Sequence, residues 1–516
     1  MTRILFLSLV LVGPVFSAAP VGGSMPSQTT AQTAAASATS DGARITMRGS
    51  PLGIANGFLY GYQGVNAYEF MPTVRRLGAG FTKTYLFWNQ VEPTRGTYDW
   101  TAVDAFVNQL KSADEALVGV FSASEWAVTK PSVLLPPSPA KNPDDYYRFI
   151  FDLVSHCKGR VRYWQNDAEP NSPIFWGGTK EEFVAELVLF HKAVKAADPD
   201  AIVVVGGYDG LFGPPGTFQF PNQQAGLDFF DYVFKEGHDA FDVFDLRLYG
   251  DPYTIVARVD YMRQMMRAHG FEKPVICTEY GGPNLFELPG NRKYIPLVAA
   301  WSQGVTGSSG QSSASGGAGG VADLYKTMSA LAPETQMFMQ GCPPELDAKY
   351  QRIQARGIVV RNLFALSAGV QKTIYWYLPA DPIEGDARFN VMALMYGKIG
   401  LVAHTSQGFG DLRLGADVFQ RMATALDGVE RVTRVAIADQ PSVMLFTIDR
   451  PGRQATWVAW ERRDAFAGED APARRVELPP GVAPSHATDA FGTAVALEPH
   501  EARVGLSLTD TPVFLQ

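Results

Sequence analysis

Residues 179–205 read TKEEFVAELVLFHKAVKAADPDAIVVV, and this helix followed by a strand decides the fold. Thr179 and Glu182 form a capping-box pattern, which predicts a helix over residues 179–196. Apolar residues line one face of that helix at helical spacing, namely Phe183, Leu187, Phe190 and Val194. Residues 202–205 are apolar at every position, as in parallel strands, because such strands are buried on both faces. The segment therefore predicts one helix–strand unit of a parallel α/β sheet.

The same alternation recurs along most of the chain. The expected strands are residues 58–62, 82–87, 116–121, 161–165, 202–205, 243–249, 275–278 and 373–377. The expected helices between them are residues 99–111, 144–154, 179–196, 227–235, 255–268 and 350–368. Eight strand–helix units predict an α/β fold, a closed (β/α)8 TIM barrel over residues 46–428.

A different pattern follows the barrel. A helix over residues 416–425 is expected to close the barrel, and short strands separated by turn residues come after it. These strands are residues 442–448, 455–461, 474–478, 494–497 and 503–508. They predict a C-terminal β-sandwich domain over residues 429–516. The sandwich could bind sugar, although a packing role against the barrel is favoured.

The first 45 residues are expected to lie outside the folded domains. Arg3 precedes a short apolar run, residues 4–12, and small residues follow, as in a secretory signal peptide over residues 1–19. The run is too short to span a bilayer, and a buried N-terminal strand or helix is the alternative. Residues 20–45 are rich in Ser, Thr, Ala, Gln and Gly, which is typical of a disordered linker. These features predict a secreted or periplasmic protein.

Residues 303–320 interrupt the barrel pattern after the seventh expected strand. They are rich in Gly, Ser and Ala, which favours a flexible loop. Since the loops after the strands surround the active site of such a barrel, we expect a mobile loop near that face.

Composition and charge argue against several classes of protein. The chain has 516 residues, of which 46% are hydrophobic and 19% charged, as in an ordinary globular enzyme. Its formal net charge of −8 is unfavourable for binding nucleic-acid phosphates. Three cysteines, Cys157, Cys277 and Cys342, leave at least one thiol free or bonded to another chain. Cys277 has apolar neighbours and is expected to be a buried, inert thiol.

Two glutamates lie at the ends of expected strands. Glu169 follows the fourth strand in Trp164-Gln165-Asn166-Asp167-Ala168-Glu169-Pro170-Asn171, and Glu279 ends the seventh in Val275-Ile276-Cys277-Thr278-Glu279. Strand ends of this kind meet at the mouth of a parallel barrel. Two carboxyl groups facing each other there can cleave a glycosidic bond, one as proton donor and one as nucleophile or as base for a water. Either glutamate alone would be read as a solvated acid, but the pair favours catalysis.

These motifs resemble those of glycoside hydrolase clan A, and of family 39 and its neighbours in particular. Ala168-Glu169-Pro170-Asn171 resembles the Asn-Glu-Pro motif after strand four, and Thr278-Glu279-Tyr280-Gly281 resembles the nucleophile motif after strand seven. Weaker similarities are residues 87–93 and 96–100 after strand two, 375–377 in strand eight and 509–515 in the sandwich. The resemblance implies a (β/α)8 enzyme acting on an oligo- or polysaccharide, with Glu169 as acid/base and Glu279 as nucleophile. It also implies a β-glycosidic bond.

Six further residues are candidates for binding the substrate: Trp88, Asn171, Trp176, Arg247, Tyr249 and Trp376. An indole can stack on the apolar face of a sugar, and Trp376, at a strand end, is the strongest aromatic candidate. Tyr249 could also donate a hydrogen bond to Glu279 and keep it ionised.

Three positions depart from the clan pattern. The residue before the acid/base is usually Asn, which binds the sugar 2-hydroxyl, but here it is Ala168. The sixth strand has Arg247 where relatives often have His, and Arg247 could pair with an acidic sugar or with Asp245. The second strand lacks an expected arginine, and Lys83 and Thr84 are the residues near that place.

The sequence as a whole predicts a secreted retaining glycoside hydrolase. No cofactor or metal is expected, since two carboxyl groups and water suffice, and neither a membrane span nor a nucleic-acid partner is expected. A glycan-binding pseudoenzyme is the alternative, because of Ala168 and Arg247. A cell-surface adhesion module would leave Glu169 and Glu279 unexplained. The retention of both glutamates favours an active enzyme.

Overall fold

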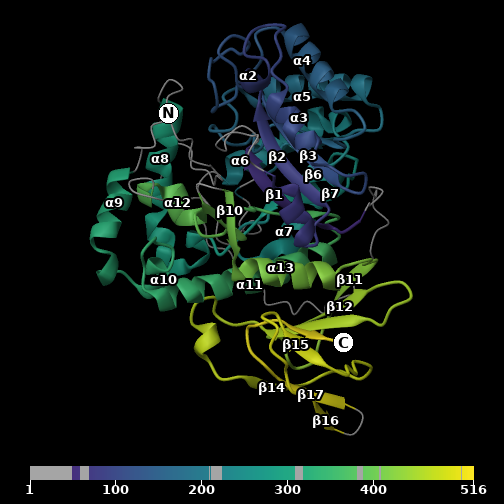
Figure 1. Ribbon diagram of the computed structural model, residues 1–516, viewed down its shortest axis with the longest axis vertical. Helices are drawn as coiled ribbons and strands as arrows, with labels where there is room; N and C mark the ends of the chain where they lie inside the picture. Colours follow the sequence, from purple (N-terminus) through teal and green to yellow (C-terminus); the bar gives the residue numbers. More distant parts are fainter. Residues whose placement is uncertain are drawn as a thin grey trace, which may run out of the picture.

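In the computed structural model, eight parallel strands form one sheet in the order β5-β4-β3-β2-β1-β8-β7-β6 (Figure 1). They are β1 (Leu52–Phe58), β2 (Phe81–Phe87), β3 (Glu115–Phe121), β4 (Tyr163–Asn166), β5 (Ile202–Val205), β6 (Phe244–Asp245), β7 (Val275–Tyr280) and β8 (Thr373–Tyr375). Parallel bridges from Val204 to Val243 and from Tyr208 to Leu246 join the two edge strands. The sheet is therefore the predicted (β/α)8 barrel.

The structure describes residues 49–58, 69–208, 210, 223–307, 318–380, 388–405, 408–500 and 503–516. The predicted signal peptide and linker lie outside these ranges.

The first strand lies earlier in the chain than predicted. β1 begins at Leu52, whereas the prediction was residues 58–62, of which 59–62 lie outside the described residues. Leu52 and Ile54 are fully buried, and Gly53 pairs with Phe81 of β2. Among the described residues, the predicted strand overlaps β1 at Phe58 alone. Phe58, Tyr60 and Tyr62 favoured the later segment in the prediction, because aromatic residues have a high strand propensity.

Six outer helices confirm the expected alternation, and all but α7 have shifted ends. They are α3 (Thr101–Val107), α4 (Pro143–His156), α5 (Lys180–Ala197), α6 (Gln223–Glu236), α7 (Ile255–Ala268) and α11 (Pro344–Ser367). At the start of α5 the Thr179 hydroxyl accepts from the Glu182 amide at 3.2 Å, and the Glu182 carboxylate accepts from the Thr179 amide at 2.8 Å. The capping box is thus confirmed.

Shorter elements complete the barrel domain. The helices are α1 (Met71–Arg76), α2 (Trp88–Val91), α10 (Pro333–Gln336), α12 (Val391–Tyr396) and α13 (Leu414–Ala425). The 3-10 helices of this domain are η2 (His238–Ala240), η3 (Pro252–Thr254), η4 (Leu285–Glu287), η5 (Pro289–Tyr294) and η6 (Met328–Ala330). Strands β9 (Val402–Thr405) and β10 (Gly408–Leu412) form an antiparallel hairpin. α13 confirms the expected closing helix.

Two helices occupy the ends of the segment that was expected to be a loop. α8 (Ile295–Gly307) and α9 (Ala318–Lys326) cover both ends of residues 303–320, and residues 308–317 lie outside the described ranges. The loop prediction is wrong at these ends. α8 begins among apolar residues, with Val298 and Trp301 buried, so tertiary packing outweighs the low helix propensity of the glycines that follow. With α10 and α12 these helices form a lobe beside the barrel (Figure 1).

Two antiparallel sheets form the C-terminal β-sandwich. One has the order β11-β12-β13-β18-β15, and the other has the order β14-β17-β16. The strands are β11 (Arg431–Val435), β12 (Val443–Asp449), β13 (Thr456–Glu461), β14 (Arg474–Glu477), β15 (Ala487–Asp489), β16 (Glu498–His500), β17 (Arg503–Leu508) and β18 (Val513–Leu515), with η8 (Gly468–Asp470) between β13 and β14. Four of the five predicted strands are confirmed. Residues 494–497 form no strand beyond a single bridge from Ala494 to Thr488.

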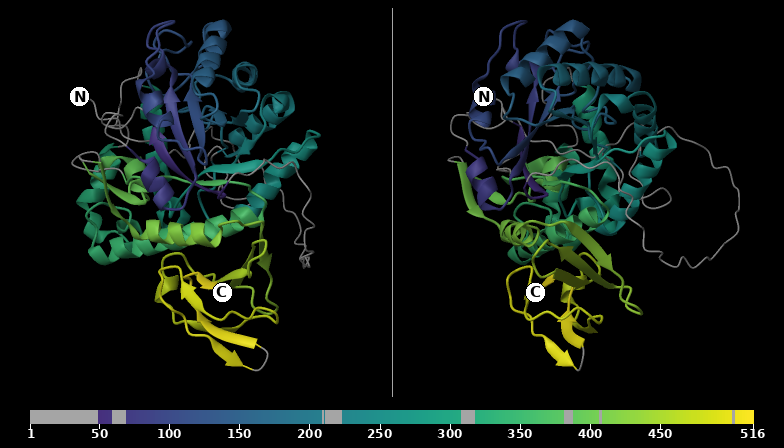
Figure 2. Two further views of the ribbon diagram at one scale, coloured as in Figure 1. Left: turned by 45° about the vertical axis from the view of Figure 1, so that its right-hand side comes forward. Right: turned by 90° about the vertical axis from the view of Figure 1, so that its right-hand side faces the viewer.

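α11 and α13 lie between the barrel and the sandwich (Figures 1 and 2). The Trp460 ring of β13 stacks on Phe446 of β12 and meets Phe364 of α11 edge-on. Its Nε1 donates a hydrogen bond to the Tyr253 hydroxyl at 2.9 Å. The sandwich therefore shares a hydrophobic core with the helices of the barrel.

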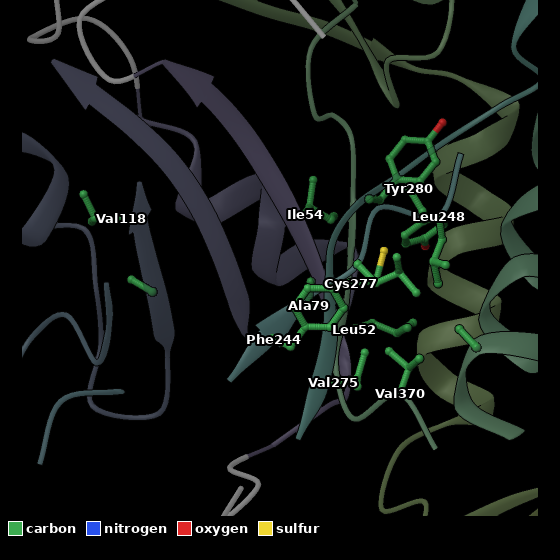
Figure 3. Packing of buried hydrophobic residues seen from close by; sticks show 14 of the residues in the cluster. Leu52, Ile54, Ala79, Val118, Phe244, Leu248, Val275, Cys277, Tyr280 and Val370 are labelled. Atoms are coloured by element: carbon green, nitrogen blue, oxygen red, sulfur yellow. The ribbon is translucent and has the colours of Figure 1, made fainter. Parts of the chain in front are cut away.

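The layer between strands and helices buries Cys277, as predicted. Figure 3 shows Cys277 near the apolar side chains of Leu52 in β1 and Val275 in β7. Burial raises the pKa of the Cys277 thiol far above its usual range. Cys157 and Cys342 are also buried and free. A protonated, enclosed thiol is unreactive.

Candidate active site

Glu169 lies in the segment that leaves the carboxyl end of β4. The chain turns at Asp167, which has a positive φ of 61°, and the Asp167 Oδ1 accepts a hydrogen bond from the Ala168 amide at 2.6 Å. Gly206 permits this turn, because a Cβ at that position would lie 2.7 Å from Cδ of Pro170. The turn holds Glu169 in the interior, where the residue is only 2% exposed.

Glu279, in β7, is surrounded by donors. Its Oε1 accepts hydrogen bonds from Tyr85 Oη at 2.7 Å and Lys83 Nζ at 3.1 Å, and lies 2.7 Å from Arg247 Nη1. Its Oε2 accepts from Tyr249 Oη at 2.9 Å. Burial alone would raise the pKa of Glu279, but the charges of Arg247 and Lys83 and the hydrogen bond from Tyr85 hold it below its usual value. Glu279 is therefore an ionised carboxylate at neutral pH.

Arg247 connects the two glutamates. Its Nη1 pairs with Glu279, and its Nε lies 3.5 Å from Oε1 of Glu169. Its Nη2 donates to the Ala168 carbonyl at 2.9 Å, and Nε also lies 3.6 Å from Oδ2 of Asp245. Because both carboxylates contact one planar guanidinium, the structure brings Glu169 and Glu279 together.

Asp245 orients the residues around Arg247. Its Oδ1 accepts from the Thr278 amide at 2.8 Å, and its Oδ2 accepts from Thr278 Oγ1 at 2.5 Å and from Gln165 Nε2 at 2.8 Å. Gly207 leaves the space for this arrangement, since a Cβ there would collide with Nε of Arg247. Residues of β4, β7 and the sixth strand thus share one buried polar network.

Of the two residues near the missing arginine of the second strand, Lys83 is the one that contacts Glu279. Its Nζ donates to Thr278 Oγ1 at 2.7 Å and to Glu279 at 3.1 Å. Thr84 instead donates its hydroxyl to the Gly57 carbonyl at 2.9 Å. Burial, together with the nearby charge of Arg247, lowers the pKa of Lys83 to about 8. Lys83 is thus the second cation beside Glu279.

Trp376 lies next to this network, and Asn171 lies close to the outer helix α6. The ring centroid of Trp376, in the residue after β8, is 6.2 Å from that of Tyr85, whose hydroxyl binds Glu279. Asn171 faces the outer helix α6, where its Nδ2 would lie 3.1 Å from a Cβ on Gly226.

Trp88 and Trp176 belong to the packing between strands and outer helices. Trp88 Nε1 donates to Glu92 Oε2 at 2.7 Å, and the Trp88 ring stacks on Phe149 of α4 with centroids 5.0 Å apart. Trp176 Nε1 donates to the Thr179 carbonyl at 2.8 Å, at the start of α5. The structure does not bring either ring to the two glutamates.

Sequence reasoning assigned no role to three residues of the network: Tyr85, Thr278 and Gln165. Alternation along the strands could have indicated Tyr85, because side chains two residues apart in a strand share a face. Lys83 and Tyr85 of β2 both reach Glu279 in this way. The same period relates Asp245, Arg247 and Tyr249 at the sixth strand.

Two features are absent from the described residues. No group of three or more His, Cys, Asp or Glu side chains in these ranges could hold a metal ion. Among the described helices, none combines the length and apolar character needed to cross a bilayer.

No model of a known protein family matches the sequence, and no curated protein matches it. Solved structures do resemble it. A family 39 glycoside hydrolase from Bacteroides cellulosilyticus has a TM-score of 0.59 at 14% identity, over 91% of this chain and 81% of the other. An endo-β-1,6-glucanase has a TM-score of 0.53 at 9% identity, over 91% of each chain. A family 51 α-L-arabinofuranosidase from Bifidobacterium longum has a TM-score of 0.52 at 12% identity, over 92% of this chain and 96% of the other.

These similarities define the fold of the chain. It has the barrel-and-sandwich fold of clan A glycoside hydrolases, as the sequence motifs suggested. At identities of 9–14% the similarity extends to the fold alone.

Proposed function

We propose that the protein is a retaining glycoside hydrolase in which Glu169 is the acid/base and Glu279 the nucleophile. The observation that carries this proposal is the pair of buried carboxyl groups on one guanidinium, within a clan A fold. The lowered pKa of Glu279 supports its assignment as the group that attacks as an anion.

In the first step, Glu169 gives a proton to the glycosidic oxygen while Glu279 attacks the anomeric carbon. The bond to the leaving group breaks and an ester between Glu279 and the sugar forms. Oε1 of Glu279 is engaged by three donors, whereas Oε2 has a hydrogen bond from Tyr249. Oε2 is therefore our candidate for the attacking atom.

In the second step, Glu169 accepts a proton from a water that attacks the same carbon. The ester bond breaks, Glu279 leaves as a carboxylate and Glu169 is protonated again. Two inversions at one carbon retain its configuration.

The substrate that we propose is an uncharged sugar unit in β-linkage. Arg247 and Lys83 both contact Glu279, so each is engaged with the catalytic carboxylate rather than held for an acidic sugar. Trp376 is the candidate for stacking on the sugar ring. From the predicted signal peptide, residues 1–19, we also propose that the protein is exported before it acts.

The pseudoenzyme alternative has less support. A protein that only binds glycans gains nothing from a buried nucleophile kept ionised by two cations, because burying charged groups costs several kcal/mol per ion. Ala168 removes one contact to the sugar 2-hydroxyl, which weakens transition-state binding without removing either reacting group.

Hydrolysis of a panel of aryl β-glycosides tests the proposal. Wild type should release the phenol from at least one of them, and Glu279→Ala should lose at least 10³-fold in kcat/KM. Glu169→Ala should retain cleavage of glycosides with acidic phenols, which leave without a proton. Added azide should accelerate this variant and give a glycosyl azide of retained configuration.

Other results would contradict parts of the proposal. Binding of oligosaccharide without turnover of any glycoside by wild type supports the pseudoenzyme. An azide product of inverted configuration from Glu169→Ala means that Glu279 is not a nucleophile. Thermal unfolding of each variant, expected to resemble that of wild type, excludes loss of the fold.

A further inference from the structure

Arg247 contacts both Glu169 and Glu279, whereas Lys83 contacts Glu279. Arg247 lies within 2.7 Å of Glu279 and 3.5 Å of Glu169. Lys83 lies 3.1 Å from Glu279, and its other hydrogen bond is to Thr278. The side chains of both cations are at most 1% exposed, so their charges are poorly screened by water.

The charges of the site balance when one carboxyl group holds a proton. Three acids, Glu169, Glu279 and Asp245, surround two cations, Arg247 and Lys83. A protonated Glu169 leaves two negative and two positive charges, which is the state needed to begin the reaction.

Formation of the glycosyl ester disturbs this balance. Glu279 loses its charge, so Arg247 loses its nearest anionic partner. Its Nε, which has no hydrogen-bond partner among the described atoms, already faces Glu169. Once Glu279 has lost its charge, the buried guanidinium of Arg247 stabilises a negative charge on Glu169, the carboxyl group that it still contacts.

We propose that Arg247 is a positioning residue for the second half of the reaction, where it holds Glu169 as the carboxylate that accepts a proton from water. This inference rests on the proposed function. The attacking water forms a bond to the anomeric carbon, its proton goes to Glu169, and the ester bond to Glu279 breaks with both electrons leaving on that carboxylate. Arg247 then pairs with Glu279 again.

The test compares Arg247→Gln with Lys83→Met on an aryl glycoside whose phenol leaves without a proton. Each variant removes one cation beside Glu279, but only Arg247→Gln removes a cation that contacts Glu169. In Arg247→Gln the second step should slow by about 100-fold, which is the rate loss expected when a general base is lost. The first step of this variant then gives a burst of phenol equal to the enzyme concentration. Azide should accelerate its turnover and yield a glycosyl azide, because azide needs no base and a protonated Glu169 does not repel it.

Lys83→Met should show no acceleration by azide. Arg247→Lys, which keeps the charge, should recover part of the rate of the second step, and this recovery separates the charge of Arg247 from its contribution to folding. A slow second step in Arg247→Gln that azide does not accelerate would overturn the inference, because Arg247 would then act on the departure of Glu279. Equal acceleration of the Lys83→Met variant would overturn it as well.

The Glu169→Ala variant separates this inference from the proposed function. If azide accelerates Glu169→Ala but not Arg247→Gln, the retaining mechanism stands and only the role of Arg247 fails. If azide accelerates neither variant and wild type shows no turnover, the proposed function itself fails.

Discussion

The hydroxyl of Tyr249 donates to Oε2 of Glu279, the oxygen with which we propose attack occurs. Tyr249→Phe removes this hydrogen bond and leaves the ring packed against Tyr396. A hydrogen bond to a charged group contributes about 1.5–3 kcal/mol, so kcat/KM should fall by about 10- to 100-fold. Steady-state kinetics on an aryl glycoside measures this loss.

Tyr98→Phe is the matched control for that substitution. The Tyr98 hydroxyl binds Asp152 at 2.6 Å and Arg148 at 2.6 Å, in the outer layer of the barrel. Its kinetic constants should equal those of wild type. If the kinetic constants of Tyr249→Phe also equal those of wild type, the hydrogen bond from Tyr249 does not contribute to the proposed attack by Glu279.

The position of Trp88 depends on where strand β2 ends. Trp88 follows β2 directly, and α2 begins at that residue, so its side chain turns outward to α4. Lys83 and Tyr85 are two residues apart in β2, so both side chains lie on the inward face of the strand. A sequence shows this alternation, but it does not show where the strand ends and the helical turn begins. The position of Trp88 could therefore not be predicted from its residue type.

At the scale of elements, α5 carries a buried acid behind β4. Glu186 is 4% exposed, and its Oε2 accepts from the Ala140 amide at 3.1 Å. Burial raises its pKa to about 7, against the opposing effect of hydrogen bonds from Ser122, Ala140 and Tyr146. Nearby Asp167, at the turn before Glu169, is also buried and has a raised pKa.

Glu186→Gln should remove a pH dependence of stability. The folded protein keeps the proton of Glu186 between pH 4.5 and about 7, while the unfolded chain has lost it. Wild type therefore loses stability as pH rises through this window, and the loss is complete above it. Relative to Glu186→Gln, the free energy of unfolding of wild type should fall by about 3 kcal/mol across the window. Urea unfolding at several pH values measures the difference.

Glu181→Gln, on the same helix, is the control for that experiment. Glu181 is exposed, and the hydrogen bonds of its own amide and of Thr179 lower its pKa below 4.5. A lowered pKa affects stability only below that value, so this variant should follow the wild-type curve from pH 4.5 to 7. Parallel curves for wild type and Glu186→Gln would show that Glu186 is already ionised in the folded state.

Elements were predictable where periodicity and end signals agree. Residues 255–268 are helical at the predicted bounds, and the capping box at Thr179 marks the start of α5. Prediction failed where composition and packing conflict. β1 contains two glycines yet is buried, and α8 extends into the Gly-rich segment from an apolar start. Burial depends on contacts between distant parts of the chain, which local propensity does not include.

At the scale of the whole molecule, Glu469 fastens the sandwich to α11. Its carboxylate lies 2.7 Å from Arg352 Nη2 and 2.8 Å from Arg356 Nη1, and Lys349 lies 3.8 Å away. The Glu469 side chain is 10% exposed, and its removal takes an anionic partner from Arg356 and Lys349, whose side chains are 7% and 10% exposed. Glu469→Ala should lower the free energy of unfolding by about 2 kcal/mol, less than for a fully buried pair because Arg352 is partly exposed.

Glu498→Ala tests whether burial is the cause. Glu498 pairs with Arg475 at 2.8 Å, but both side chains are about half exposed. Its loss should cost less than about 0.5 kcal/mol in the same denaturant titration. Equal losses for the two variants would contradict a special role of the Glu469 contact.

α11 also links the sandwich to the candidate active site. From this helix, Gln354 Nε2 donates to the Tyr375 hydroxyl at 2.8 Å, and Arg361 Nη2 donates to the Gly250 carbonyl at 3.1 Å, next to Tyr249. Its Phe364 meets Trp460 of the sandwich. The C-terminal sheets therefore cannot be exchanged or removed without changing the contacts of α11. Removing them from the barrel would expose Phe364 on the helix that also contacts Tyr375 and Gly250 beside the candidate active site.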